Sequence, residues 1–271
     1  FVLGDFGCEL EAKIAAMAGA RHAIGLASGT DALLLALAAL GLLLVPIHVW
    51  DVFVTTDAPL VLWSFLSGLA FWRASRDDDY RWYLGAGALL GLAFLSKYFA
   101  VLLGIAYLGF VLCSPKRDRH WRGFLLTCAG ALPFVAVNLY WNYENCWANL
   151  MFNLYNRHDD AGFSWKTPLL YALTLGYVLS PPALFALARD RAWVAGLRQR
   201  RSLLLIVILG GLPFLLFAAL SLFKQIGLHW VLSFVPFFYA ACALVLSRRA
   251  LKASALFLGI FSLVHVAAII A

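Results

Sequence analysis

Two charged residues stand at the ends of apolar runs, where their side chains could do chemistry. Asp57 belongs to the stretch Thr55–Leu60 and begins one run. A carboxylate there can cap a helix, and it can also act as a general base or bind a ligand. Lys97 separates two short runs, 83–95 and 98–113. Its ammonium can snorkel to the end of the apolar layer or bind an anion such as a phosphate.

The segment from Asn142 to Lys166 is rich in asparagine and aromatic residues. Amides suit the hydroxyls of a sugar, and aromatic rings suit its apolar face. Asn142 and Trp147 are therefore candidate substrate-binding residues, and Glu144 is a second candidate catalytic carboxylate. An interfacial belt of aromatic residues is the alternative explanation for the tryptophans.

The same segment contains a short run that could hold a divalent metal ion, His158-Asp159-Asp160. Adjacent residues rarely converge on one metal without help from elsewhere in the chain. These three are weak metal candidates, and the residues by themselves establish no cofactor.

A last polar cluster lies late in the chain, at Lys224, His229 and Trp230. A histidine in such a place is commonly an interfacial polar residue. Beside Lys224 it could instead add positive charge for binding a phosphate. All three are candidate substrate-binding residues.

The composition shows where these residues must sit. Of 271 residues, 63% are hydrophobic and only 13% are charged, against about 45–50% and about 25% in soluble domains. A soluble fold, a disordered chain and a disulfide-stapled secreted domain are all excluded. We expect an all-α, polytopic bundle of transmembrane helices, because backbone groups in lipid must be hydrogen-bonded within their own segment.

Eight or nine apolar segments can be distinguished, and the loops between them differ sharply in charge. Fifteen basic residues fall in one set of alternate loops and four in the other set. Cytoplasmic loops collect Lys and Arg, so Asp57, Lys97, the segment 142–166 and the segment 224–229 are expected on the extracytoplasmic side. The same asymmetry explains the net charge of +7 without any nucleic-acid partner.

From about Val45 onward the chain resembles the polyprenyl-phosphate-sugar-dependent glycosyltransferases of the GT-C fold. Within that group it is most similar to the bacterial branch that includes protein mannosyltransferases, aminoarabinose transferases and lipopolysaccharide-core galacturonosyltransferases. The resemblance is carried by the order and spacing of four stretches, which are Thr55–Leu60, Gly91–Tyr98, Trp141–Trp147 and Lys224–Pro236.

This resemblance implies an enzyme of the bacterial inner membrane whose site faces the periplasm. Its partners would be a polyprenyl-phosphate-linked sugar donor, a lipid, glycan or protein acceptor, and the bilayer itself. By matching, Lys97 would contact the lipid phosphate and Asp57 would be an active-site carboxylate. His229 and Trp230 would line the same cavity, and a divalent metal ion is compatible with the chemistry.

The first helix of that family, and the outer loop with an Asp-Glu pair that follows it, have no counterpart here. We therefore expect an N-terminally truncated transferase, with its activity in doubt. Residues 1–41 resemble instead a fragment of PLP-dependent nucleotide-sugar aminotransferases, through Glu9–Lys13 and Ala20–Leu33. In those enzymes a turn such as Gly29-Thr30 cradles the PLP phosphate. Their Schiff-base lysine is missing here, so PLP is not expected to bind.

The predicted organisation is thus an aminotransferase-like fragment at 1–41, which is no independent domain, joined to a GT-C-like membrane region at 45–271. Two alternatives to an active transferase remain open. One is a non-catalytic membrane remnant that binds the lipid carrier. The other is a transporter, which would show broken apolar segments at matching positions in two halves of the chain.

Overall fold

The computed structural model describes residues 5–17, 19–21, 36–37, 40–41, 44, 56–115, 120–154, 162–197 and 200–270. Every regular element in these ranges is a helix, which confirms the predicted all-α class. The α-helices are α1 (Asp5–Met17), α3 (Asp57–Asp77), α4 (Tyr80–Ser96), α5 (Val101–Cys113), α6 (Trp121–Glu144), α7 (Ala148–Leu154), α8 (Lys166–Leu179), α9 (Pro181–Arg189), α10 (Ala192–Gly196), α11 (Arg201–Ser221), α12 (Val235–Val245) and α13 (Arg248–Ile270). Short 3-10 helices cover Tyr98–Ala100, Leu228–Trp230 and Leu232–Phe234.

Several helices are built to cross a membrane. Among the described residues, α6, α11, the Leu228–Val245 segment and α13 are long and apolar enough, and α8 with α9 makes a fifth span if that bent pair is counted as one. This is fewer than the eight or nine segments expected. The helices α4 and α5 have 17 and 13 residues, whereas a span needs about 20. The first of the apolar segments expected from the sequence, residues 32–50, lies largely outside the described residues.

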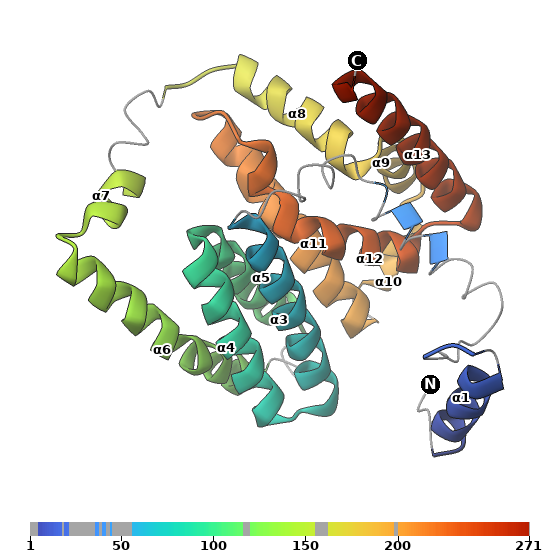
Figure 1. Cartoon of the computed structure of the whole chain (residues 1–271), viewed down its shortest axis with the longest axis horizontal. Coiled ribbons are helices and arrows are strands. Elements are labelled where there is room, and N and C mark those ends of the chain that lie inside the picture. The colour runs from blue at the N-terminus through green and yellow to red at the C-terminus, as the bar shows by residue number, and fades with distance from the viewer. Residues whose placement is uncertain are drawn as a thin grey trace.

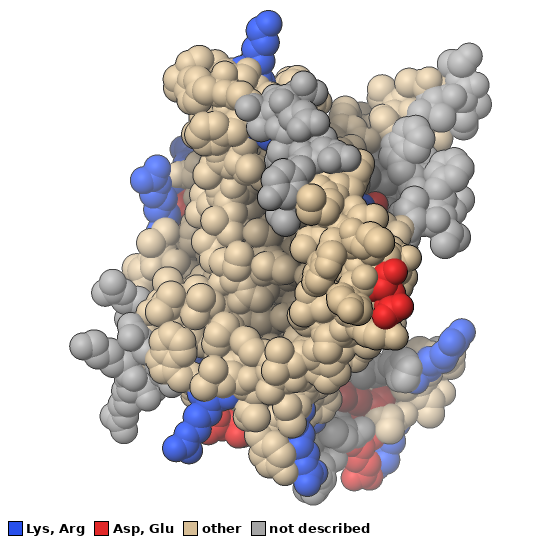
Figure 2. Space-filling view, turned by 90° about the vertical axis from the view of Figure 1, so that its left-hand side faces the viewer, with Lys and Arg blue, Asp and Glu red and all other residues tan. Residues whose placement is uncertain are grey.

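The helices form two groups. Figure 1 shows α3, α4, α5 and α6 on one side and α8, α9 and α11 to α13 on the other, with α11 reaching across to α5. The side of the molecule in Figure 2 is broad and mostly uncharged, with Lys and Arg side chains toward its margins. An uncharged belt of this kind is what contact with lipid requires.

The apolar stretch 167–187, one of the segments expected from the sequence, turns sharply within its length. The axes of α8 and α9 differ by 99°, and the break falls at Ser180, whose φ is 64°. Pro181 and Pro182 follow, and neither can donate the backbone hydrogen bond that would continue α8. The hydroxyl of Ser254 in α13 donates to the Ser180 hydroxyl over 2.8 Å and fastens the bend to its neighbour.

The helices α3, α4 and α6 pack closely through small residues. A Cβ at Gly87 of α4 would meet the backbone carbonyl of Thr127 in α6, and a Cβ at Gly130 would meet the carbonyl of Leu84. Small residues allow such backbone-to-backbone contact between membrane helices. On the other face of α4, the Ser67 hydroxyl of α3 donates to the Ala86 carbonyl over 2.8 Å. These contacts fix α4 between its two neighbours.

Replacing Gly87 with alanine is expected to destabilise the protein by about 1–3 kcal/mol, because the new methyl group has no room beside the α6 backbone. The thermal midpoint of the purified full chain in detergent measures the loss. Gly85→Ala is the matched control, because nothing lies within 4 Å of a Cβ at that position in the same helix. Equal midpoints for the two variants would contradict the close contact between α4 and α6.

The helix ends gather at two opposite ends of this bundle. At one end, the start of α3 meets the end of α4 through Asp57 and Lys97. At the other end, Asp78 follows α3 and lies 2.8 Å from the imidazole of His120, just before α6. Tyr83 near the start of α4 is hydrogen-bonded to the same imidazole. We call these the Lys97 end and the His120 end, and they separate the helix ends as the charge pattern predicted.

Candidate functional site

Lys97 lies where the chain passes from α4 to α5. The hydroxyl of Ser96 donates to the Leu92 carbonyl over 3.0 Å, a bond that competes with continuation of the helix. Lys97 then adopts an extended backbone, with φ −161° and ψ 139°. The 3-10 turn Tyr98–Ala100 leads into α5. The ammonium is therefore carried by a short break at the end of the helix pair, as the two short apolar runs predicted.

The two principal candidate residues form an ion pair. Lys97 Nζ donates to Asp57 Oδ1 over 2.5 Å, and the two side chains are 22% and 13% exposed. Asp57 is the first residue of α3, where unpaired backbone N–H groups favour a negative charge. The preceding Thr56 makes no side-chain cap. The structure thus places a sheltered carboxylate and a sheltered ammonium in direct contact.

Tyr98 carries the polar surface of the site onward from Lys97. Its hydroxyl donates to Asn138 Oδ1 over 3.2 Å and accepts a hydrogen bond from Asn149 Nδ2 over 3.0 Å. Asn142 Nδ2 approaches the same hydroxyl at 3.4 Å. The hydroxyl of this tyrosine therefore contacts side-chain amides from both α6 and α7, and Tyr98 directly follows Lys97 of the ion pair in the sequence.

Asn142 is nearly inaccessible, with 1% of its surface exposed. Its Nδ2 donates to the Asn138 carbonyl over 2.9 Å, and its Oδ1 accepts from the backbone N–H of Leu150 over 3.2 Å. The backbone carbonyl of Asn142 accepts from Trp147 N–H over 2.7 Å. This side chain holds the turn between α6 and α7, so its amide is already engaged within the protein.

Trp147 lies in that turn and is 39% exposed. Both Cys146 and Trp147 have left-handed backbone, with φ values of 52° and 58°. The bonds to Asn142 support this uncommon conformation for side chains other than glycine. The turn presents the indole at the surface of the Lys97 end.

The late cluster reaches the same end through stacking. The ring of Trp230 is 4.6 Å from the ring of Phe99, two residues after Lys97, and 6.1 Å from Phe217 in α11. Trp230 is buried, with 6% of its surface exposed. His229 is exposed and Lys224 is half-buried on the same segment. Trp230 thus joins the segment that carries His229 to the turn that carries Lys97.

The remaining predicted residues lie apart from the ion pair or outside the described chain. Glu144 is exposed at the end of α6 and has neither a hydrogen bond nor an ion pair with a described residue. His158, Asp159 and Asp160 fall outside the described residues. Within the part of the chain that is described, no group of three His, Cys, Asp or Glu side chains could hold a metal ion. The weak metal candidates therefore stay untested.

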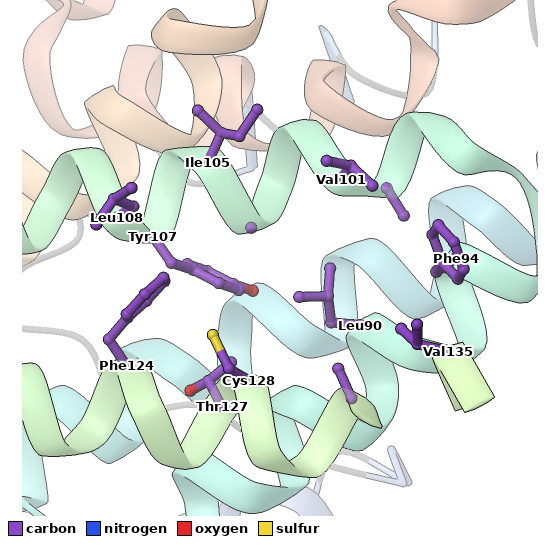
Figure 3. Close-up of a pocket in the computed structure, with 13 residues that line it drawn as sticks. Leu90, Phe94, Val101, Ile105, Tyr107, Leu108, Phe124, Thr127, Cys128 and Val135 are labelled. Atoms are coloured by element: carbon purple, nitrogen blue, oxygen red, sulfur yellow. The ribbon is translucent and has the colours of Figure 1, made fainter. Parts of the chain in front are cut away.

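The structure also contains an apolar groove of about 430 Å³ that was not expected from the sequence. It lies between α4, α5 and α6, with Phe94 and Val101 at one end and Leu108 and Phe124 at the other (Figure 3). Phe94 and Val101 are three and four residues from Lys97 in the sequence. The 13 lining residues are Leu90, Phe94, Ala100, Val101, Gly104, Ile105, Tyr107, Leu108, Phe124, Thr127, Cys128, Ala131 and Val135.

Comparison with known proteins agrees with the predicted resemblance. Residues 24–141 match the family described as dolichyl-phosphate-mannose-protein mannosyltransferase. The match confirms the resemblance over this part of the chain, which is less than half of its length. It includes Asp57, Lys97 and Tyr98, and it begins earlier than the expected residue 45. It ends at residue 141, so the stretches 142–147 and 224–236 lie beyond it.

A second comparison concerns a short part of the chain. Over 40 residues the chain is 58% identical to the UDP-N-acetyl-3-dehydro-alpha-D-glucosamine 3-aminotransferase of Acidithiobacillus ferrooxidans, which is 15% of this chain and 11% of that protein. The chain thus spans about one tenth of the length of that curated relative. This agrees with the expected aminotransferase-like stretch, while the division into 1–41 and 45–271 stays a prediction. No solved structure gives a significant match.

Proposed function

We propose that this chain is a membrane glycosyltransferase that moves a sugar from a polyprenyl-phosphate carrier to a hydroxyl of a lipid, glycan or protein acceptor. The observation that carries the proposal is the Asp57–Lys97 ion pair, which lies within the matched residues, and Phe94 and Val101 at one end of the apolar groove are three and four residues from Lys97 in the sequence. A cation, a carboxylate and an apolar channel are the three groups that such a donor and such a reaction require.

The donor fits this arrangement in two parts. A polyprenyl chain is apolar, and the groove from Val101 to Leu108 extends over seven residues of α5, which is about 10 Å of helix. The phosphate at the head of the chain would lie beside Lys97, whose ammonium can form charge-assisted hydrogen bonds with it. Binding there would draw the ammonium toward the phosphate and away from the Asp57 carboxylate.

The proposed reaction is a displacement at the anomeric carbon of the sugar. The bond between this carbon and the phosphate oxygen breaks, and a bond to the acceptor oxygen forms. Asp57 takes the proton of the acceptor hydroxyl, and Lys97 stabilises the negative charge that grows on the departing polyprenyl phosphate. Proton, sugar and leaving group are all accounted for without any cofactor, although the chemistry would tolerate a divalent ion.

The sugar would be recognised by the polar surface next to this pair. Asn149 is half-buried and donates to the Tyr98 hydroxyl, and a side-chain amide of this kind can also bond a sugar hydroxyl. Trp147 and His229 are exposed at the Lys97 end, where the indole of Trp147 can stack on a sugar face. Asn142 would keep this surface in place, because its side chain holds the turn between α6 and α7.

The charge asymmetry of the loops supports an orientation with the Lys97 end outside a bacterial inner membrane. The substrate would then be a component of the cell envelope, and modification of lipopolysaccharide is one such use. A transporter would require broken spans at matching positions in two halves, and the described residues contain one bent pair, α8 with α9.

The proposal is tested by supplying the purified full chain with sugars on polyprenyl phosphates of long and short chain and following transfer to an envelope lipid extract. We expect transfer from these donors and none from nucleotide sugars. Gly104→Leu, whose added atoms enter the groove, should raise the KM for the long-chain donor about tenfold, a loss that two or three lost methylene contacts would cause.

Gly85→Leu is the control for this substitution, because it adds the same side chain to open space in α4. The short-chain donor should be transferred equally well by both variants. Transfer from nucleotide sugars, or equal KM values for the long-chain donor in the two variants, would contradict the proposed donor and its place in the groove.

A further inference from the structure

A second cavity lies at the opposite end of the bundle from the proposed site. It measures about 320 Å³ and is lined by Arg200, Arg201, Ser202, Leu203 and Leu244. Four of these residues surround the start of α11, and Leu244 comes from the last turn of α12. The cavity therefore lies where two apolar spans end, at the level of one membrane boundary.

Arg201 lines this cavity and carries donors that no group in the described part of the chain uses. Its Nε and Nη2 are buried and have no hydrogen-bond partner, although burying such donors unpaired costs free energy. The guanidinium is held in place from one side, because its carbon lies 5.6 Å from the ring centroid of Phe110 in α5. Two parallel N–H groups in a fixed plane are the geometry that binds a phosphate in two places.

The backbone adds to this positive site. The first N–H groups of α11 have no acceptor within the helix, and Arg200 at the N-cap makes no side-chain cap. A helix start of this kind attracts an anion. Arg201, the exposed Arg200 and Ser202 all line the same cavity.

We propose that this cavity binds the phosphate of an anionic phospholipid in the membrane leaflet at the His120 end. The lining has two chemical sides, which are a basic side at Arg200, Arg201 and Ser202 and an apolar side at Leu203 and Leu244. Leu244 is 53% exposed and would contact the first carbons of an acyl chain. A free phosphate would use only the basic side, so the apolar side favours a lipid.

The site is distinct from the donor site in both place and leaflet. Arg201 lies against Phe110 near the end of α5, whereas Lys97 lies before the start of that helix. Basic pockets between membrane helices on the Lys- and Arg-rich side commonly hold anionic head groups. A lipid bound here would bridge α11 and α12 at their shared end and would join both helices to the leaflet.

Native mass spectrometry of the purified full chain tests the proposal, with phosphatidylglycerol, phosphatidylcholine or inorganic phosphate added in neutral detergent. We expect retention of phosphatidylglycerol at concentrations at least about tenfold lower than phosphatidylcholine. Arg200→Gln/Arg201→Gln should weaken that retention about tenfold or more, the loss expected for charge-assisted hydrogen bonds. Arg201→Lys keeps the charge without the planar fork and should weaken it by less.

Arg189→Gln/Arg191→Gln is the control, because it removes two exposed charges, one at the end of α9 and one just before α10, and should leave retention unchanged. If the double variant at the cavity does not fold, Arg200→Gln alone, at an exposed position, still must weaken retention. Equal retention of the two lipids, no loss in the cavity variants, or displacement of phosphatidylglycerol by inorganic phosphate at equal concentration would overturn the proposal.

Discussion

Asp57→Asn is expected to lower sugar transfer by about 10²–10⁴-fold, which is the range for loss of a positioned general base. The amide keeps the shape of the side chain at the start of α3, but it cannot accept the proton of the acceptor hydroxyl. Binding of the donor should persist, because Lys97 is then released from its ion pair. The measurement is single-turnover transfer, with donor binding followed separately by equilibrium retention of labelled polyprenyl phosphate.

Asp77→Asn provides the matched control for this change. It removes a carboxylate from the other end of the same helix, where Asp77 pairs with Arg76 at 2.8 Å, and transfer should stay unchanged. Full transfer by Asp57→Asn would rule out its role as a base and would direct attention to Glu144. A remnant that only binds the carrier would show donor binding and no transfer in the unaltered chain as well as in the variant.

Lys97→Gln is expected to reduce both donor binding and the rate of transfer. The affinity for polyprenyl phosphate should fall about 10- to 100-fold, because charge-assisted hydrogen bonds to the phosphate are lost. The value of kcat/KM should fall by roughly 10²–10³-fold, since the developing charge on the leaving phosphate is no longer stabilised. Retention of labelled polyprenyl phosphate and single-turnover transfer measure the two effects separately.

Lys166→Gln removes an exposed cation from the start of α8 and should affect neither quantity. The variant Lys97→Gln also removes the ion pair of Asp57 with Lys97, so the double variant Asp57→Asn/Lys97→Gln checks that the loss of binding does not come from the charge of the Asp57 carboxylate. If both Lys97 variants bind polyprenyl phosphate as well as the unaltered chain does, the phosphate is bound elsewhere. Loss of binding in the single variant but not in the double variant would assign the effect to the negative charge of Asp57.

The sequence was sufficient to predict which ends of the helices meet. The charge of alternate loops placed Asp57 and Lys97 on one side of the membrane, and the structure brings their charged groups to 2.5 Å. The short apolar runs around Lys97 also predicted a break there, which Ser96 and the extended backbone of Lys97 produce. These features follow from local hydrophobicity and charge, which a single sequence records directly.

Other features depend on contacts that a single sequence does not record. Asn142 has the residue type of a sugar-binding side chain, yet its amide is used in the turn between α6 and α7. The groove exists because small residues such as Gly104 and Ala131 line facing helices, and their facing is a matter of packing. The bend at Ser180 could have been predicted, because Pro181 and Pro182 mark it. An average hydropathy, however, carries no information about the direction of a helix axis.

The backbone contact at Gly87 and Gly130 has a consequence for how a ligand is received. The helices α4 and α6 pack against each other through main-chain atoms, and we expect them to move as a rigid unit. Lys97, which follows α4, then keeps a fixed distance from Asn138 in α6. A flexible pocket would lose conformational entropy each time a bound ligand ordered its side chains. Here much of that organisation is already completed when the chain folds, so the affinity for a bound head group is not reduced by it.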